Sequence, residues 1–289
     1  RLAKAGVDLA VLARGEHLAA IQRHGLRLKD PSGETVTQLE AYGRAEEIGV
    51  ADLVVFAVKA QQLAKAIDDA GPLMAGEGLA LPFQNGVDAP DMLAAAFGRE
   101  RMLIGVARIF ATIANPGLID KVSPFATFTI GNIEGRQTVP AVEQIRELFK
   151  SADIDVPDCA DVKVELWEKF VLMNAVSGVT AAARCDIGTA RAHPETWSLF
   201  RALVKEAAAV GVARGIELGG IVDKVMALAE TIPSDLRASQ AHDLEAGKPL
   251  EVDWLSGAAA RIGDELGVPT PASAAVAAVL APWRAGGLG

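Results

Sequence analysis

The sequence has 289 residues, of which 51% are hydrophobic and 22% are charged. This length suits two domains, and the composition is that of an ordinary globular protein, which excludes a disordered chain. The 28 lysines and arginines against 37 aspartates and glutamates give a net charge of −9, so duplex nucleic acid would be repelled.

The cysteines and the apolar runs exclude further classes of protein. Cys159 and Cys185 lack the spacing of zinc ligands, which indicates a reducing compartment without a disulfide framework or a metal site. No apolar run reaches the ~18 residues that a membrane span needs, and the first residues do not resemble a signal peptide. A cytoplasmic enzyme without membrane contact is expected.

The first half of the chain alternates strand-like and helix-like segments. Strands are expected at Val7–Ala13, Ala51–Val58, Gly78–Pro82 and Met102–Ile109, with hairpins over Leu26–Ala41 and Thr112–Gly131. Helices are expected at Glu16–His24, Gln61–Ala70, Ala89–Phe97 and Val139–Ser151. The nearly uninterrupted apolar run Ala51–Val58 is typical of a buried parallel strand. This alternation predicts an α/β domain with a Rossmann-type doubly wound parallel sheet over residues 1–158.

The second half is rich in alanine and in apolar residues at helical spacing. Helices are expected at Val164–Ala183, Thr196–Arg214, Gly220–Thr231, Gln240–Glu245, Val252–Leu266 and Ala272–Trp283. The pattern predicts an all-helical domain over residues 159–289, with the boundary at Pro157-Asp158.

The opening residues predict a truncation. Arg1 to Gly6 is typical of the last turns of a helix closed by a glycine. In a dinucleotide-binding domain such a helix follows the first strand and its glycine loop. We therefore expect both to be missing from this sequence, and we expect the fragment to bind a dinucleotide poorly and to be less stable.

Arg14 follows the strand expected at Val7–Ala13, at the position that selects between the two nicotinamide cofactors. A carboxylate there favours NAD, whereas an arginine can pair with the phosphate of NADP. Neither Asp nor Glu ends this strand, so Arg14 predicts NADP, although Glu16 weakens the signal. A solvated loop arginine is the alternative.

Lys59 and Asn85 also follow expected parallel strands, where open α/β sheets bind ligands. The lysine would bind the cofactor or a carboxylate, and the amide would position the nicotinamide. Each residue alone is also typical of a plain loop or a helix cap. Their shared location favours a binding role.

Lys169, Met173 and Ser177 are spaced to share one helical face within an increasingly apolar stretch. Partial burial would suit the lysine to donate a proton. The alternative is an exposed lysine beside Glu165 and Glu168, and periodicity alone favours it. The acidic residues between positions 239 and 253 indicate, by the same reasoning, solvated helix charges.

Six short motifs, found in this order along the chain, favour a functional role for these residues over a solvated surface: LAKAG, LAR, VKA, QNG, WEKFVLMNAVSGVTA and LEVDWLSG. Together they span nearly the whole chain, which resembles the ketopantoate reductase family, whose members reduce 2-oxo acids with NADPH. The resemblance implies an NADP-binding domain, a helical domain for substrate binding and dimerisation, and a small 2-oxo acid substrate. It also implies a homodimer and, if the substrate is ketopantoate, a place in pantothenate biosynthesis.

The resemblance assigns roles to the matching residues. Lys169 would be the general acid, Glu251 would hold a substrate hydroxyl, Ser239 would lie near the substrate carboxylate, Arg14 would bind the 2′-phosphate, and Lys59 and Asn85 would lie near cofactor and substrate. Ser177 is also expected among the substrate-binding residues.

Two departures concern the substrate. Family members often carry asparagines where this chain has Met173 and Ser177, which puts ketopantoate itself in doubt more than the type of reaction. One alternative is a related β-hydroxyacid or 6-phosphogluconate-type dehydrogenase. Another is a non-catalytic nucleotide-binding protein, and the presence of Lys169 and Glu251 counts against it.

Overall fold

The computed structural model describes residues 1–287, and its contacts divide the chain into two compact units. Unit 1 comprises residues 1–58, 62–84 and 90–162. Unit 2 comprises residues 59–61 and 85–89 together with the chain from Lys163 onwards. The last change of unit follows Val162. Within residues 1–287, no helix is long and apolar enough to span a bilayer.

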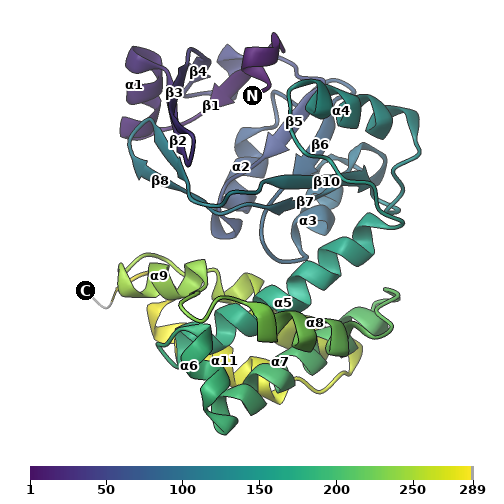
Figure 1. The fold of residues 1–289 in the computed structure, drawn as a ribbon. Helices are drawn as coiled ribbons and strands as arrows, with labels where there is room; N and C mark the ends of the chain where they lie inside the picture. The colour runs from purple at the N-terminus through teal and green to yellow at the C-terminus, as the bar shows by residue number, and fades with distance from the viewer. Residues whose placement is uncertain (288–289) are drawn as a thin grey trace. The chain divides into compact units, whose positions relative to one another are not determined.

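Unit 1 contains the strands and the first helices (Figure 1). The strands are β1 (Ala10–Leu12), β2 (Leu26–Asp30), β3 (Gly33–Thr37), β4 (Glu40–Tyr42), β5 (Leu53–Phe56), β6 (Leu79–Pro82), β7 (Leu103–Arg108), β8 (Ala111–Asn115), β9 (Leu118–Lys121) and β10 (Thr127–Asn132). The helices are α1 (Gly15–His24), α2 (Leu63–Asp69), α3 (Ala89–Phe97), whose first residue belongs to unit 2, and α4 (Pro140–Ser151). The expected α/β alternation is confirmed.

The strands form four hydrogen-bonded groups. Parallel pairs join β1 to β4 and β5 to β6, while β7 pairs antiparallel with β10. The fourth group has the order β3-β2-β9-β8 and contains both expected hairpin turns. Within residues 1–287 no ladder joins β1 to β5, so the prediction of one doubly wound sheet is confirmed only in part. Strand β4 was expected inside a hairpin and instead pairs with β1.

The expected burial of residues 51–58 is wrong in part. Phe56 is buried, but Val55 is 40% exposed and Val58 is also exposed. The reason is that β5 forms a ladder on one side only, with β6, among the described residues. The apolar core of unit 1 lies instead where α4 packs on β7 and β10, and it includes Leu81, Leu103, Ile130, Val142, Ile145, Phe149 and Val156.

Unit 2 is helical, as predicted (Figure 1). Its helices are α5 (Val162–Ala182), α6 (Ile187–Ala192), α7 (Pro194–Ala213), α8 (Ile221–Thr231), α9 (Ser239–Glu245), α10 (Ser256–Leu266) and α11 (Pro271–Leu280). Helix α6 was not predicted, although Asp186 caps it by accepting from the Thr189 amide, a usual N-terminal signal. The helix expected over 252–266 is broken at Leu255, where a 3-10 turn (Val252–Trp254) meets α10.

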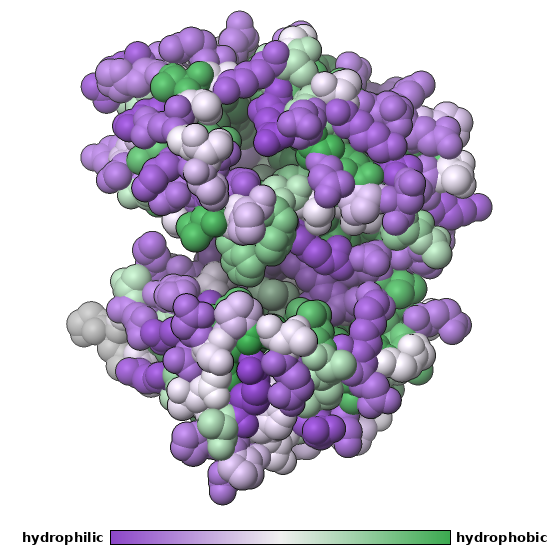
Figure 2. Space-filling model, viewed as in Figure 1, coloured by the Kyte–Doolittle hydropathy of each residue, from purple (hydrophilic) through white to green (hydrophobic). Residues whose placement is uncertain are grey.

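The surface fits the acidic composition. Most of the face in Figure 2 is hydrophilic, and its apolar side chains form separate patches. Many large apolar side chains of unit 2 are buried, among them Phe170, Phe200, Leu203 and Ile262. Burial of this apolar surface provides the main stabilisation of the helical unit.

Candidate functional site

Lys169 lies in the middle of α5 and donates a hydrogen bond from Nζ to Oδ1 of Asn85, at 3.0 Å. Asn85 follows β6 along the chain and belongs to unit 2 with Lys169. Its Nδ2 atom donates to Oε2 of Glu251 at 3.4 Å. An ammonium only donates and a carboxylate only accepts, so these two partners fix the orientation of the amide between them. The result is a continuous chain from Lys169 through Asn85 to Glu251.

Glu251 is a buried carboxylate, only 4% exposed, that directly precedes the 3-10 turn at Val252. Its Oε1 atom accepts a hydrogen bond from the backbone amide of Ala60 at 3.0 Å, and its Oε2 lies 3.7 Å from Nζ of Lys59. Burying a charge is costly unless it is paired and hydrogen-bonded. Glu251 meets both conditions, and it links the residues after β5 and β6 to the helical unit.

Lys59 forms the second ion pair of the site. Its Nζ donates to Oδ2 of Asp243 on α9 at 2.9 Å. Desolvation acts to lower the pKa of Lys59, but the charge of Glu251 and the charge and hydrogen bond of Asp243 outweigh it, so the pKa lies above its ordinary value. The Lys59 side chain is still 46% exposed and therefore offers a permanent positive charge to solvent at neutral pH.

The loop after β6 is held in place by its neighbours. The Gln84 amide donates to the carbonyls of Phe56, at 3.0 Å, and Val58, at 3.1 Å, which joins the ends of β5 and β6. Gly86 has a φ of +90°, and a Cβ there would lie 2.6 Å from the Trp254 carbonyl oxygen. Only glycine fits this conformation and this close approach. Asn85 therefore sits between two fixed residues, which limits its freedom to leave Lys169.

Arg14 lies in unit 1, directly after β1 and before α1, as expected. Its guanidinium is more than half exposed and forms an ion pair with Asp69, the last residue of α2. Lys65 approaches the same carboxylate at 3.0 Å. Two cations thus share one acidic partner, which leaves one excess positive charge at the end of β1. Such a surface suits a phosphate group.

The remaining predicted residues lie on α5 and α9. Ser177 is fully buried, and its hydroxyl has no hydrogen-bond partner among the described residues. Met173, one turn earlier, is partly buried. Ser239 is the first residue of α9 and is exposed. The structure therefore brings Lys59, Asn85, Lys169 and Glu251 together by direct contacts, whereas neither serine contacts this group by a hydrogen bond.

Asp243 is the residue that sequence reasoning missed. It was expected to be a solvated helix charge, but only 16% of its side chain is exposed, because it packs against Lys59. By contrast, Asp253 is about half exposed and pairs with Arg284, as expected of a surface charge. The spacing of Asp243 four residues after Ser239 on one helical face was the available signal.

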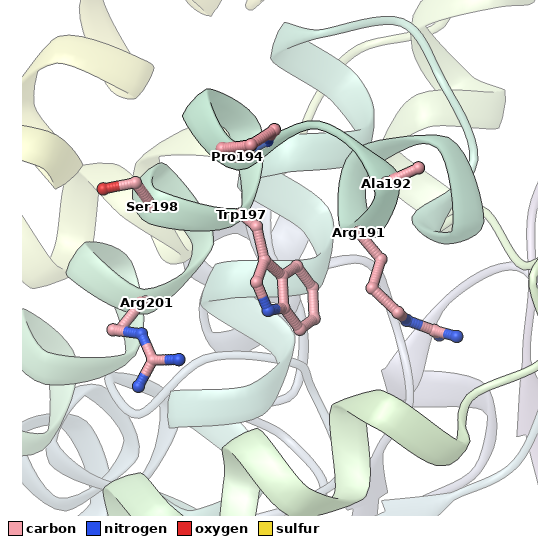
Figure 3. A pocket seen from close by; sticks show the side chains of 6 residues that line it. All are labelled: Arg191, Ala192, Pro194, Trp197, Ser198 and Arg201. Carbon is pink, nitrogen blue, oxygen red and sulfur yellow. The ribbon is translucent and has the colours of Figure 1, made fainter.

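A separate hollow of about 390 Å³ lies between α6 and α7 (Figure 3). Its lining residues are Arg191, Ala192, Pro194, Trp197, Ser198 and Arg201. Arg191 donates to the carbonyls of Ala229, at 3.0 Å, and Ile232, at 2.7 Å, so it fastens α6 to the end of α8. The indole of Trp197 stacks on Phe200. Arg191 and Trp197, which line the hollow, therefore contribute to packing between the helices.

The chain matches models of known protein families. Residues 1–135 match the family described as ketopantoate reductase PanE/ApbA, and residues 161–283 match its C-terminal domain. The chain belongs to the ketopantoate reductase family. The resemblance stated from the six motifs is thereby confirmed. The match begins at residue 1, so it lends no support to the predicted truncation.

Individual relatives agree with this assignment. A 2-dehydropantoate 2-reductase of Mesorhizobium japonicum is 30% identical, over 97% of this chain and 91% of the relative. The crystal structure of a PanE/ApbA family ketopantoate reductase from Ralstonia eutropha JMP134 has a TM-score of 0.88 at 27% identity, covering 98% of this chain and 92% of that one.

A D-mandelate dehydrogenase, solved with NADH and anilino(oxo)acetate, shares the fold. Its TM-score is 0.87 at 20% identity, and the likeness covers 98% of this chain and 92% of that one. At this identity the likeness shows the fold alone. As a member of the ketopantoate reductase family, the protein described here is an oxidoreductase.

Proposed function

We propose that this family member reduces a 2-oxo acid with NADPH, with Lys169 as the general acid. The observation that carries the proposal is the hydrogen-bonded chain Lys169–Asn85–Glu251, flanked by the ion pair of Lys59 with Asp243. It holds the ammonium of Lys169 through the partly buried Asn85 on the buried Glu251, and it keeps the ammonium of Lys59 partly exposed. A keto acid needs both, because it has a carbonyl to protonate and a carboxylate to bind.

A bound NADPH would supply the hydride that reduces the keto carbon. Lys169 holds a proton at the keto oxygen and transfers it as negative charge develops there. A positive charge at that atom stabilises the transition state more than the ground state, which is the condition for catalysis. Asn85 positions the ammonium through its Oδ1 atom, because the other end of its amide is held by Glu251.

The other residues would bind the substrate. Lys59 offers its exposed charge to the carboxylate, and Ser239 lies on α9 four residues before the Asp243 that holds Lys59. Glu251 would accept a hydrogen bond from a hydroxyl on the substrate tail through a free lone pair. Ketopantoate fits this set, and its product would be pantoate. Met173 favours, as a second candidate, a 2-oxo acid with a more apolar tail.

The residues of unit 1 fit the phosphate of NADP. Arg14 and Lys65 together carry two positive charges against the one negative charge of Asp69. A phosphate dianion would pair with the planar guanidinium in a bidentate way, which a ribose hydroxyl cannot do. Arg14 and Lys65 are therefore the residues that we propose to hold the 2′-phosphate.

The proposed activity is tested by following NADPH oxidation by the protein with ketopantoate and with 2-oxo acids that have branched aliphatic or aromatic tails. We expect turnover with at least one acid, and oxidation of the matching 2-hydroxy acid by NADP in the reverse direction. Turnover with ketopantoate would establish the substrate. No turnover with any acid, by a protein that binds NADPH, would overturn the proposal.

Arg14→Ala is expected to reduce kcat/KM for NADPH by about 10- to 100-fold, because a hydrogen-bonded charge pair with the phosphate is lost. With NADH, which lacks this phosphate, the change should be under about 3-fold. The matched control is Arg23→Ala, which removes an exposed arginine at the other end of α1. Equal losses with both cofactors would contradict the assignment of Arg14.

A further inference from the structure

The segment that begins at Glu251 holds the loop that carries Asn85, and both belong to unit 2. At the start of this segment, Glu251 accepts a hydrogen bond from Asn85 at 3.4 Å. One residue further along the loop, Gly86 approaches Trp254 so closely that a Cβ atom would lie 2.6 Å from the carbonyl oxygen. Two neighbouring points of the loop are thus fixed in register with the second segment.

Asp88 and Arg261 form the third contact between the loop and this segment. Nη2 of Arg261, on α10, donates to Oδ1 of Asp88 at 2.6 Å. Only 12% of the Asp88 side chain is exposed, and its Oδ2 atom is buried without a hydrogen-bond partner among residues 1–287. Burying a carboxylate is costly unless it is paired, so Asp88 depends on Arg261 for compensation.

Arg261 has a second, more exposed partner in Glu265. This carboxylate lies one turn further along α10, is 57% exposed, and accepts from Nη1 of Arg261 at 3.3 Å. Desolvation acts to lower the pKa of Arg261, but the hydrogen bond and charge of Asp88, followed by those of Glu265, outweigh it, so the pKa lies above its ordinary value. The shorter and more buried of the two pairs is therefore the one that holds the loop.

We infer that Arg261 and Asp88 are positioning residues that keep Asn85 in contact with the general acid. The three contacts follow the same order along both segments, and the ion pair closes the end of the series. Without Arg261, Asp88 would be a buried charge without a partner, and the loop would shift until the carboxylate reached water. Asn85 lies three residues earlier in this loop, so the same shift would take its Oδ1 away from Nζ of Lys169. The inference rests on the proposed reductase function.

The first test is the kcat of Arg261 variants with the best 2-oxo acid. Arg261→Ala is expected to lower kcat by about 10- to 100-fold, because a displacement of about 1 Å in a catalytic group has a cost of this size. Arg261→Lys should stay within about 3-fold of the unmutated value, since an ammonium can replace the single hydrogen bond to Asp88. Glu265→Ala is the matched control and should leave kcat unchanged, because it removes only the exposed partner of Arg261.

An Asn85→Ala background separates positioning from a general structural role. If Arg261 acts through Asn85, Arg261→Ala should lower kcat by less than about 2-fold once the amide is already absent. Losses of the same size with and without Asn85 would overturn the inference, because Arg261 would then act by another route. An unchanged kcat of the single variant Arg261→Ala would overturn it as well.

Hydrogen exchange of the backbone amides gives a readout that does not depend on turnover. Arg261→Ala should speed exchange at residues 85–88 by about 10-fold or more, whereas Glu265→Ala should not. Unchanged exchange in Arg261→Ala would show that the ion pair does not hold the loop. Absence of turnover by the unmutated protein with every acid, together with faster exchange in Arg261→Ala, would instead count against the reductase function and leave the role of the pair in the loop intact.

Discussion

Replacing Lys169 by alanine is expected to lower kcat by about 10²- to 10⁴-fold, the usual contribution of a positioned general acid. The proton that neutralises the alkoxide would then have to come from water. The dissociation constant of NADPH should change by less than about 3-fold, because the residues proposed to hold its phosphate lie in unit 1. Steady-state kinetics and a fluorescence titration with NADPH measure the two effects separately.

The control for this prediction is Lys205→Ala, which removes an exposed lysine on α7 and should leave kcat unchanged. Added methylamine should restore part of the activity of Lys169→Ala, because a small ammonium ion can occupy the vacated space. A variant that turned over at the normal rate would show that another group donates the proton. A variant that lost NADPH affinity as strongly as kcat would place Lys169 in cofactor binding.

Replacing Glu251 by alanine is expected to raise KM for the 2-oxo acid by about 10- to 100-fold, with a smaller effect on kcat. The change leaves the Ala60 amide and the Asn85 amide without an acceptor and removes one of the two anionic neighbours of Lys59. We also expect a loss of about 1–3 kcal/mol in the free energy of unfolding. This is less than the cost of breaking a fully buried pair, because Lys59 is partly exposed and keeps Asp243.

Two further variants separate charge from shape at this position. Glu251→Gln keeps an oxygen that can accept from Ala60 but removes the charge beside Lys59, so stability should recover more than KM. Asp253→Ala removes an exposed carboxylate two residues away and should alter neither quantity. If Glu251→Ala left KM unchanged with the best substrate, Glu251 would have no place in substrate binding.

Local patterns predicted most of the helices and strands, but pairing between strands was harder. The alternation of the first half and the alanine-rich periodicity of the second were enough for both classes of domain. Strand β4 was missed because three residues after a hairpin carry too little pattern, and its partner β1 lies about 30 residues earlier. The break at Leu255 was missed because apolar residues at helical spacing continue through it.

The same contrast between local pattern and distant contacts applies to single residues of the site. Lys59 and Asn85 could be selected because each follows a parallel strand, a position set by local pattern. Asp243 could not, because a polar residue on a short helix is usually solvated and only the contacts of α9 bury it. The ion pair of Arg14 with Asp69 was equally hidden, since the two residues are 55 positions apart. Contacts between distant segments carry no local signal.

The division of the chain limits how its two units could be exchanged by recombination. Residues 59–61 and 85–89 group with the helices, so the polypeptide passes between the two units five times rather than once. A gene fragment that encoded only Lys163 onwards would retain Lys169 and Glu251 but would lack Lys59 and Asn85. The helical half alone therefore does not contain the complete group of contacting residues. Recombination at the boundary after Val162 would separate Lys169 from the Asn85 amide that accepts its hydrogen bond, so the two halves have to be inherited together.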